Sequence, residues 1–451
     1  MTAKRFWDEK GYSRVKQLPL YMMILWTALL LCSPTAFAQE YSLRDLYAEA
    51  VKNSEKIKYA EENLYIAKMG KEKAWAVLMP RVTAFGTYNR FSEKKYGDPP
   101  AYGNVLIQPN ESGNWGVRAD ESFSLSIREL DALKISGQLI SKSEFDLEST
   151  KSDFIFFVAT AYYDALKAKK ALEIAAANVE RLTQYRYFVE KRLKVGEVTR
   201  TALLRADGEL SGAQSDYLRA TNAFQLARAA LVRVTGIEEN FRLREEAPDF
   251  SAVDAFDRLR QTAFQMRPDL KSYDVQIQVS ERQVKYARGA FWPYVGFFAI
   301  YNGADQNPAT STLNRESVLA GVSLNFPFFE GGLRVAELKE ARSRERQARL
   351  AYDDLKKNVD IEIRGAWLDL ETQRGTLKFL EDQLVFAHDN YNAVLRQYQN
   401  GLATSLDVMD ANTLLLTSER NTVDALYGCQ LAHLRVRKSS GTLLRFVQEG
   451  Y

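Results

Sequence analysis

The chain has 451 residues, 26% of them charged and 12% aromatic, which is an ordinary composition for a globular protein. The formal net charge is +3, and the first 16 residues, with five basic and two acidic side chains, carry that excess. The whole chain has 61 basic and 58 acidic residues, so 56 of each remain after this segment. The even balance excludes the basic surface that a nucleic-acid partner would require.

The N-terminal residues 1–38 have the features of a signal peptide. A basic segment precedes an apolar run that ends at Cys32, and the small residues Ala36 and Ala38 suit cleavage before Gln39. The run is short for a transmembrane helix. An uncleaved anchor, lipidation of Cys32 and a later start codon are alternatives, but we expect an exported protein.

The exported part of the chain has few groups suited to catalysis. No stretch after residue 38 is apolar enough to predict a transmembrane helix. One cysteine, Cys429, allows no disulfide, and two histidines, His388 and His433, without a cysteine cluster predict no zinc site. We find no catalytic constellation and no phosphate-binding loop, so we predict neither enzyme activity nor a cofactor.

The first elements after the signal are a helix and two strands. Apolar residues at spacings of three and four predict a helix over 43–78, which Pro80 ends. Residues 81–89 and 115–127 are typical of strands. The glycines and prolines between them predict a loop over 92–114.

The same order returns 213 residues later. A helix is predicted over 269–290, Pro293 follows it, and a strand over 294–302 leads into a loop over 303–315. The next strand, 317–326, alternates between two sets of side chains. Such a strand suits the wall of a membrane barrel, although a soluble sheet with one wet face gives the same pattern. The predicted lipid-facing side chains are Val318, Ala320, Val322, Leu324 and Phe326.

Two long helical hairpins account for most of the remaining chain. From Leu203 to Val234, apolar residues recur at alternating spacings of three and four, which is a coiled-coil pattern. The run from Leu333 to Asn400 has no proline, and at about 1.5 Å per residue it would form a helix roughly 100 Å long. No compact domain holds such a helix, so the protein must be elongated.

Glycine marks the turn of each long hairpin, and the two turns lie 205 residues apart. Gly196 pairs with Gly401, and Thr199 pairs with Thr404, at that offset. Fixed spacing with few identical side chains is typical of a duplicated structural repeat. The predicted division is a first repeat over 39–246, a second over 247–441 and a short tail over 442–451.

The four predicted strands cannot close a barrel by themselves, because about eight strands is the smallest common closed size. An open sheet edge in lipid leaves backbone groups unpaired, at a cost of several kcal/mol each. If the strands lie in a membrane, the chain must oligomerise. A homotrimer would supply twelve strands with cyclic symmetry.

Taken together, these features resemble the TolC family of outer-membrane efflux proteins. The resemblance covers residues 41–441. It rests on the Arg-Pro-Asp-Leu motif at 267–270, on the segment 321–332 and on the two turns at 194–199 and 399–404. These motifs occur in the order expected of the family and behind a signal peptide.

The resemblance implies a mainly α fold with a β-barrel part, in which a homotrimer joins a twelve-stranded outer-membrane barrel to a long α-helical tunnel in the periplasm. It implies a passive exit duct for efflux or type I secretion. The partners it implies are a periplasmic adaptor protein, an inner-membrane pump of the RND, ABC or MFS type, and outer-membrane lipid. Residues 122–127 lack the proline and glycines of 327–332, so that junction must be built differently.

The resemblance also implies a gate after the second turn. Asp407 and Asp410 match the family's acidic constriction, and at a spacing of three they share one helical face. A trimer would bring such acids into a carboxylate ring, which attracts cations and raises its own pKa values by mutual repulsion. Two solvated acids on a coiled-coil exterior are the alternative. Tyr398 occupies the position of a gating tyrosine.

The ion pair between helices that belongs to the family's gate is missing from this sequence. Ala202 and Ala403 stand where the protein that gives the family its name has an acidic and a basic residue. We therefore expect packing and the acidic ring to hold the closed state, with Arg200 or Arg205 as a substitute cation. The expected adaptor-facing tips are Gly196, Thr199, Gly401 and Thr404.

An exported coiled-coil structural or adhesive protein without a pore is the alternative to a duct. The alternating strand 317–326 and its counterpart in the first repeat favour the duct, because a scaffold would not need them. The sequence does not identify the cargo, since similar ducts serve drugs, metal ions and proteins.

Overall fold

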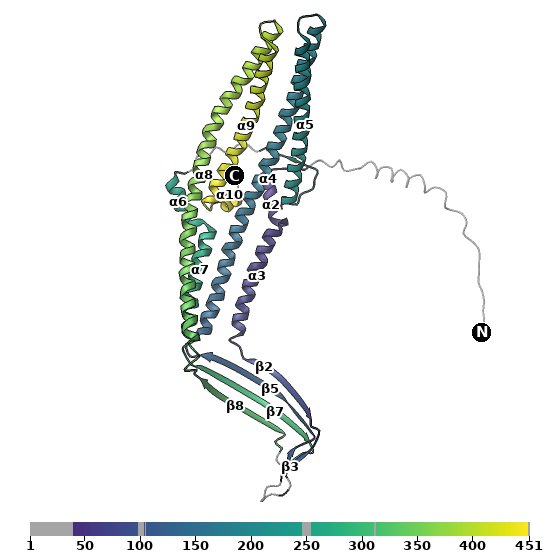
Figure 1. Cartoon of the computed structure of the whole chain (residues 1–451). Coiled ribbons are helices and arrows are strands. Elements are labelled where there is room, and N and C mark those ends of the chain that lie inside the picture. The colour runs from purple at the N-terminus through teal and green to yellow at the C-terminus, as the bar shows by residue number, and fades with distance from the viewer. Residues whose placement is uncertain (1–38, 98–102, 104, 246–253, 311–312, 450–451) are drawn as a thin grey trace, which may run out of the picture.

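The computed structural model describes residues 39–97, 103, 105–245, 254–310 and 313–449. The predicted signal peptide, with Cys32, lies outside the described residues. The described chain is a long rod of helices that ends in a four-stranded sheet (Figure 1). Two helical hairpins form the free end of the rod, and the strands lie at the opposite end.

The first helical stretch consists of two helices, α2 (Leu43–Asn53) and α3 (Glu55–Ala76). The prediction of one helix over 43–78 is wrong at Ser54. This residue has an extended backbone, with φ −67° and ψ 121°, and its hydroxyl accepts a hydrogen bond from the amide of Ile57. Serine in this conformation caps a helix N-terminus, so a new helix begins there.

The main sheet has four antiparallel strands in the order β2-β5-β7-β8. Each of the four predicted strands is confirmed, with shifted ends. The helices lead down to the sheet, and its strands slant away from the axis of the rod (Figure 1). The strands are β2 (Arg81–Arg90), β5 (Glu111–Ser124), β7 (Tyr294–Asn307) and β8 (Glu316–Asn325).

Strand pairing extends beyond the predicted boundaries. The segment 92–114, predicted as a loop, contains β3 (Lys95–Gly97), β4 (Val105–Gln108) and the start of β5. Strand β7 likewise reaches into the predicted loop 303–315. Here β5 and β7 pair although they lie far apart in the sequence. This pairing outweighs the local preference of glycine and asparagine for turns, on which the loop predictions rested.

Each long hairpin consists of a 67-residue helix and a shorter return helix. Helix α4 (Arg128–Lys194) turns into α5 (Arg200–Thr235), and α8 (Leu333–Gln399) turns into α9 (Ser405–Ser439). At about 1.5 Å per residue, α8 spans about 100 Å, so the predicted long helix is confirmed. Helix α7 (Pro268–Gly289) packs between α4 and α8 in the lower half of the rod.

The two junctions from strand to long helix are built differently. Before α8, Gly331 and Gly332 have positive φ values of 62° and 85°. Before α4, where glycine is missing, Ile127 itself has φ 54°, an uncommon conformation for a β-branched residue. The hydroxyl of Ser126 donates a hydrogen bond to the carbonyl of Gly289 at 3.0 Å. This bond holds the turn against the end of α7.

Short elements surround the rod at mid-height and form a waist. Strand β1 (Gln39–Tyr41) pairs in parallel with β6 (Phe241–Leu243). Helix α6 (Phe256–Met266) packs on α8. Helix α10 (Leu443–Glu449) lies within the segment predicted as a tail and packs against α4 and α9.

Arg267 fixes the corner between α6 and α7 to the long helices. Its guanidinium donates to the carboxylate of Asp269 at 2.7 Å and to that of Glu362, on α8, at 2.7 Å. It also donates to the main-chain carbonyl of Ser439, the last residue of α9, at 3.1 Å. The Arg-Pro-Asp-Leu motif of the sequence is thus a structural clamp at the waist.

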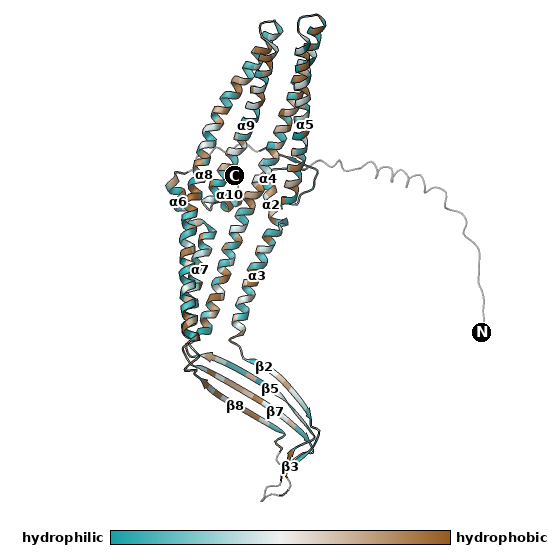
Figure 2. Cartoon of the chain, in the orientation of Figure 1, coloured by the Kyte–Doolittle hydropathy of each residue, from teal (hydrophilic) through white to brown (hydrophobic). Residues whose placement is uncertain are grey.

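Apolar packing along the rod occurs in separate clusters. One lies at the waist around Leu43 and Tyr162, one between the hairpins around Tyr185 and Val408, and one around Ile363 on α8. Hydrophilic and hydrophobic residues are interspersed along the whole length of the helices (Figure 2). Among the described residues, no helix combines the length and the hydropathy needed to span a membrane.

Candidate functional site

The register of the main sheet places its apolar side chains on one face. Residues directly opposite each other in neighbouring strands share a face, and successive residues alternate. Val318, Val322 and Leu324 therefore share a face with Tyr301, Phe297 and Val295. On this face, across all four strands, the central residues are apolar except for Glu121. They are Val82, Ala84, Gly86, Tyr88, Trp115, Val117, Ala119, Phe123, Val295, Phe297, Ala299, Tyr301, Val318, Ala320, Val322 and Leu324.

The apolar face is open to solvent in the single chain, and Val318 is 78% exposed. Of the five side chains predicted to face lipid, four lie on it. The fifth, Phe326, follows the last residue of β8, because Pro327 has no amide hydrogen for strand pairing. Its ring packs edge-on against Phe328, with centroids 4.9 Å apart.

The opposite face of the sheet is mainly polar. It carries Arg81, Asn302 and Ser323 as well as Arg118 and Asp120, whose side chains form an ion pair at 2.7 Å. A sheet with one apolar and one polar face is what a barrel wall between lipid and water requires.

The two outer edges of the sheet have no strand partner in the described chain. Strands β2 and β8 are the ends of the order β2-β5-β7-β8, and each is paired along one edge only. Three antiparallel steps separate them, so they run in opposite directions. Their free edges are therefore suited to pair with each other in an antiparallel ladder between copies.

The two helix tips have the same turn geometry. Gly196 and Gly401 both have φ +77°, which glycine adopts without the steric penalty of a side chain. The amide of Glu197 donates to the carbonyl of Arg192 at 3.0 Å, and that of Leu402 donates to the carbonyl of Gln397 at 2.8 Å. In both tips this bond closes the last turn of the long helix in a Schellman-type cap.

The tips differ where the return helices begin. Thr404 and Asp407 form a capping box at the start of α9, and the Thr404 amide donates to Asp407 Oδ2 at 2.7 Å. The Thr404 hydroxyl donates to the same oxygen at 2.7 Å. These bonds lower the pKa of Asp407 below its usual 3.8, the amide contributing most. Thr199, the counterpart at the start of α5, has no side-chain cap bond.

Asp410 lies one helical turn beyond Asp407, and both side chains are exposed in the single chain. Among the described residues, none forms a hydrogen bond or an ion pair with the carboxylate of Asp410. The two acids thus have different surroundings within one chain. Asp407 caps a helix, whereas Asp410 is available to groups outside the chain.

Tyr398 is buried at the point where the two hairpins meet, with 3% of its surface exposed. Its ring lies 5.6 Å from that of Tyr185 and 6.0 Å from that of Phe188, both on α4. The Tyr185 hydroxyl donates to the hydroxyl of Ser405, at the start of α9, at 2.8 Å. Burial raises the pKa of Tyr185 well above its usual 10.

Arg192 is a contact between the hairpins that the sequence did not predict. Its Nη1 donates to the main-chain carbonyl of Tyr398 at 2.8 Å, and its guanidinium lies 5.4 Å from the Tyr398 ring. Its Nε donates to Glu197 at 2.7 Å. Arg200 and Arg205, the predicted substitutes, are exposed, and neither forms an ion pair among the described residues. Within the single chain, the cation that contacts Tyr398 is Arg192, at the end of α4.

Further contacts join α4 to α9 below the tips. Arg181 forms two parallel hydrogen bonds with Glu419, both 3.0 Å long. The buried side chains of Asn178 and Asn412 are joined by a hydrogen bond of 3.0 Å. The described residues contain no group of three or more His, Cys, Asp or Glu side chains placed to hold a metal ion.

Comparison with known proteins places these features in a family. The profile of the outer membrane efflux protein family matches residues 46–237 and 259–442. The outer membrane efflux protein BepC of Brucella suis is 22% identical over 388 residues, which are 86% of this chain and 81% of that protein. The alkaline protease secretion protein AprF of Pseudomonas aeruginosa is 22% identical over 437 residues, covering 92% and 87% of the two chains.

Solved structures share the fold at similar levels of identity. The crystal structure of CusC superimposes with a TM-score of 0.78 at 18% identity, covering 90% of this chain and 93% of that one. The outer membrane protein VceC of Vibrio cholerae superimposes with a TM-score of 0.75 at 20% identity, covering 88% and 96%. CusC forms a transmembrane channel and VceC is an outer membrane protein, and a coiled-coil scaffold without a pore is not favoured. The chain belongs to the outer membrane efflux protein family, the family of TolC, and is an outer-membrane exit channel that extends into the periplasm.

Proposed function

We propose that three copies of the chain close their sheets into one barrel of twelve strands. The observation that carries this proposal is the sheet itself, with one apolar face and two free edges. Strand β8 of one copy and β2 of the next run in opposite directions, so they can pair as the other strands do. Closure removes unpaired backbone groups from the lipid.

The hairpins of the three copies would form the tunnel on the periplasmic side of the barrel. We propose that the chain is a duplication, with repeats over 39–246 and 247–441 and a short tail over 442–451. The equal lengths of α4 and α8, 67 residues each, and the same order of helix, two strands and hairpin support it. Two hairpins in each copy supply six to the wall of a trimeric tunnel.

The duct would act passively, as an exit for cargo that an inner-membrane pump delivers. The turns around Gly196, Thr199, Gly401 and Thr404 are the proposed contacts with a periplasmic adaptor, because they are the ends of the rod furthest from the sheet (Figure 1). The pump is of the RND, ABC or MFS type. Names of relatives point to different cargoes, since AprF is a protease secretion protein and CusC a cation efflux protein.

The gate would lie at the tips. In this proposal the closed state is held by the cluster of Tyr398, Tyr185 and Arg192, and Asp407 and Asp410 form the acidic ring where the three copies converge. Burial of the aromatic cluster between the hairpins and exposure of both acids in the single chain support this arrangement.

The oligomeric state and the channel conductance, measured on one preparation, test the proposed function. Protein extracted from outer membranes should migrate as a species of three 51.4 kDa chains, less the signal peptides, and convert to monomer on boiling. The same preparation should give discrete conductance steps in a planar bilayer. A monomer that conducts nothing would contradict the proposal and favour a structural or adhesive coiled coil.

A further inference from the structure

Glu121 is an acid on the apolar face of the sheet. It lies directly opposite Phe297 on β7, and its neighbours along β5 on the same face are Ala119 and Phe123. Across this face, the other acidic residues of the four strands lie at the end away from the helices. A charged group facing lipid is costly, so such a residue is a candidate for a specific interaction.

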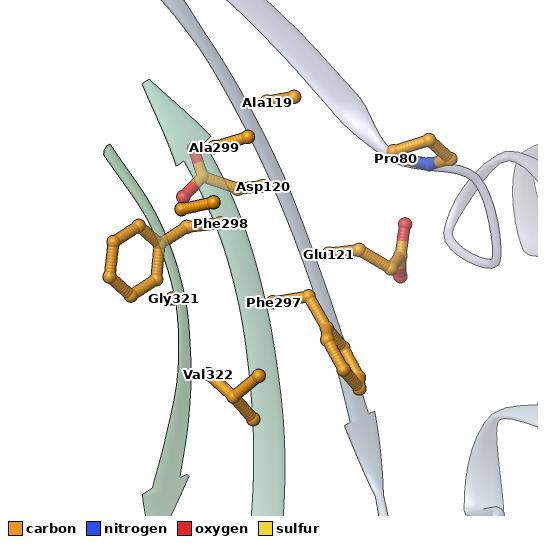
Figure 3. Close-up of a pocket in the computed structure, with 10 residues that line it drawn as sticks. Pro80, Ala119, Asp120, Glu121, Phe297, Phe298, Ala299, Gly321 and Val322 are labelled. Atoms are coloured by element: carbon orange, nitrogen blue, oxygen red, sulfur yellow. The ribbon is translucent and has the colours of Figure 1, made fainter. Parts of the chain in front are cut away.

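A hollow of about 460 Å³ opens beside this carboxylate. Figure 3 shows Glu121 and Phe297 on the same side of the sheet, with Pro80 across from Glu121, while Asp120 and Phe298 point to the other side. Ala119 and Val322 also line it, so most of its surface is apolar. The hollow thus combines a wall suited to an alkyl chain with one acid.

The two oxygens of Glu121 have different surroundings. Oε1 accepts a hydrogen bond from the amide of Ser122 at 3.2 Å. Oε2 is shielded from solvent, and no group among the described residues donates a hydrogen bond to it. A shielded carboxylate oxygen without a donor is unfavourable unless a ligand supplies one.

The position of Glu121 along β5 matches the level of lipid headgroups. Strand β5 ends at Ser124, next to the helices, three residues from Glu121. At about 3.3 Å per residue and a strand tilt of about 40°, Glu121 lies roughly 8 Å from that end.

We propose that this hollow binds one phospholipid of the periplasmic leaflet, with a primary ammonium headgroup donating to Glu121 and an acyl chain along Phe297 and Val322. The inference rests on the proposed barrel, in which this face meets lipid. An ammonium group at the Glu121 carboxylate donates N–H hydrogen bonds and neutralises the acid. Phosphatidylethanolamine has this headgroup, whereas phosphatidylcholine has the same charge and phosphate but no N–H donor.

Competition between these two lipids tests the proposal on the unmodified protein. Purified wild-type trimer would be mixed with equal amounts of both lipids, with identical acyl chains, and retained lipid counted by native mass spectrometry. The trimer should retain phosphatidylethanolamine about tenfold better, the ratio expected for one charge-assisted hydrogen bond, with up to one molecule per chain. Equal retention of the two lipids would overturn the proposal, with no variant involved.

Two variants locate the site. Glu121→Gln keeps the shape of the side chain and should abolish the preference, whereas Asp120→Asn, one residue away on the other face, should keep it. Retained preference in Glu121→Gln, or loss in both, would place the lipid elsewhere. Trimer migration and conductance, measured on the same samples, separate these results from failure of the barrel itself.

Discussion

At the residue scale, Arg192 joins the free ends of the two hairpins. One guanidinium hydrogen-bonds the Tyr398 carbonyl and Glu197 and also lies against the rings of Tyr398 and Phe188. Its side chain is 17% exposed, so solvent screens these contacts less than it would at the surface. Opening the tip by moving one hairpin away from the other must break the contact with Tyr398.

Arg192→Ala should therefore favour the open state. Loss of a charge-assisted hydrogen bond costs about 1.5 kcal/mol, which corresponds to roughly a tenfold rise in open probability. Single-channel recording measures it directly. Arg200→Ala is the matched control, because Arg200 is exposed and has no ion-pair partner among the described residues. Equal effects of both changes would mean that the closed state does not depend on Arg192.

Also at the residue scale, Asp407 has two roles: it caps helix α9, and it is a member of the proposed acidic ring. Within the chain it caps α9 through Thr404, and these bonds lower its pKa. Because the pKa is lowered, the cap contributes stability above the usual value of 3.8, and this contribution is lost as the pH falls through the lowered pKa. Repulsion between the carboxylates of neighbouring copies in a ring would raise the pKa of Asp407.

Thr404→Val removes one of the two donors to Asp407. We expect the pH at which cation selectivity declines to rise in this variant, because the carboxylate loses its bond to the hydroxyl and keeps only the amide. Selectivity measured as a function of pH in planar bilayers reports the midpoint. Thr199→Val should leave it unchanged, since Thr199 makes no side-chain cap bond. An unchanged midpoint in Thr404→Val would show that the cap does not control Asp407 in the trimer.

At the element scale, close glycine–aromatic contacts fix the register of the sheet. The rings of Phe85, Trp115 and Phe298 lie where a side chain on Gly116, Gly303 or Gly321 would project. Each contact joins neighbouring strands, so shifting one strand by a residue would remove it. Pairing glycine with an aromatic side chain across strands is a known way of setting register.

Gly116→Ala should destabilise the sheet. A methyl group there would overlap the carbonyl oxygen of Tyr301 and the ring of Phe85, and such overpacking costs about 1–3 kcal/mol. The temperature at which the trimer dissociates in gel migration should fall. Gly86→Ala is the control, because nothing lies within 4 Å of a Cβ at Gly86. A trimer as heat-resistant as wild type would mean that the strands adjust without cost.

At the scale of the whole molecule, the acidic ring exists only if three copies bring their second hairpins together. Each chain supplies Asp407 and Asp410 from α9, and their counterparts at the start of α5 are Ala202 and Arg205. Only the second repeat can therefore contribute acids to the ring, and a trimer has six of them. A ring of this charge raises the local cation concentration at the narrow end of a tunnel.

The double change Asp407→Asn/Asp410→Asn should lower the cation-to-anion permeability ratio by about an order of magnitude, because it removes six charges from one ring. Reversal potentials in a salt gradient measure this ratio. Asp216→Asn, on α5, is a control carboxylate outside the tips. Unchanged selectivity in the double variant would favour the alternative of two solvated acids on the exterior.

Local patterns were enough to predict the hairpins. The turns at Gly196 and Gly401 depend on backbone conformations that glycine adopts readily, and the long helices follow from heptads uninterrupted by proline. Ser54 was missed although the signal was local, because its cap interrupts an apolar spacing that continues through it. Ile127 could not have been predicted, since tertiary contacts hold its left-handed conformation.

The sequence by itself determined the two long hairpins, the tip turns and the alternating strand 317–326, because each depends on residues close together in the chain. Only the tertiary structure decided which residues these elements bring together. It extended β5 by pairing it with β7, gave Tyr398 its partner Arg192, and placed Glu121 on the apolar face of the sheet. Those outcomes depend on pairing and packing between residues at least 170 positions apart in the chain, and no local preference encodes them.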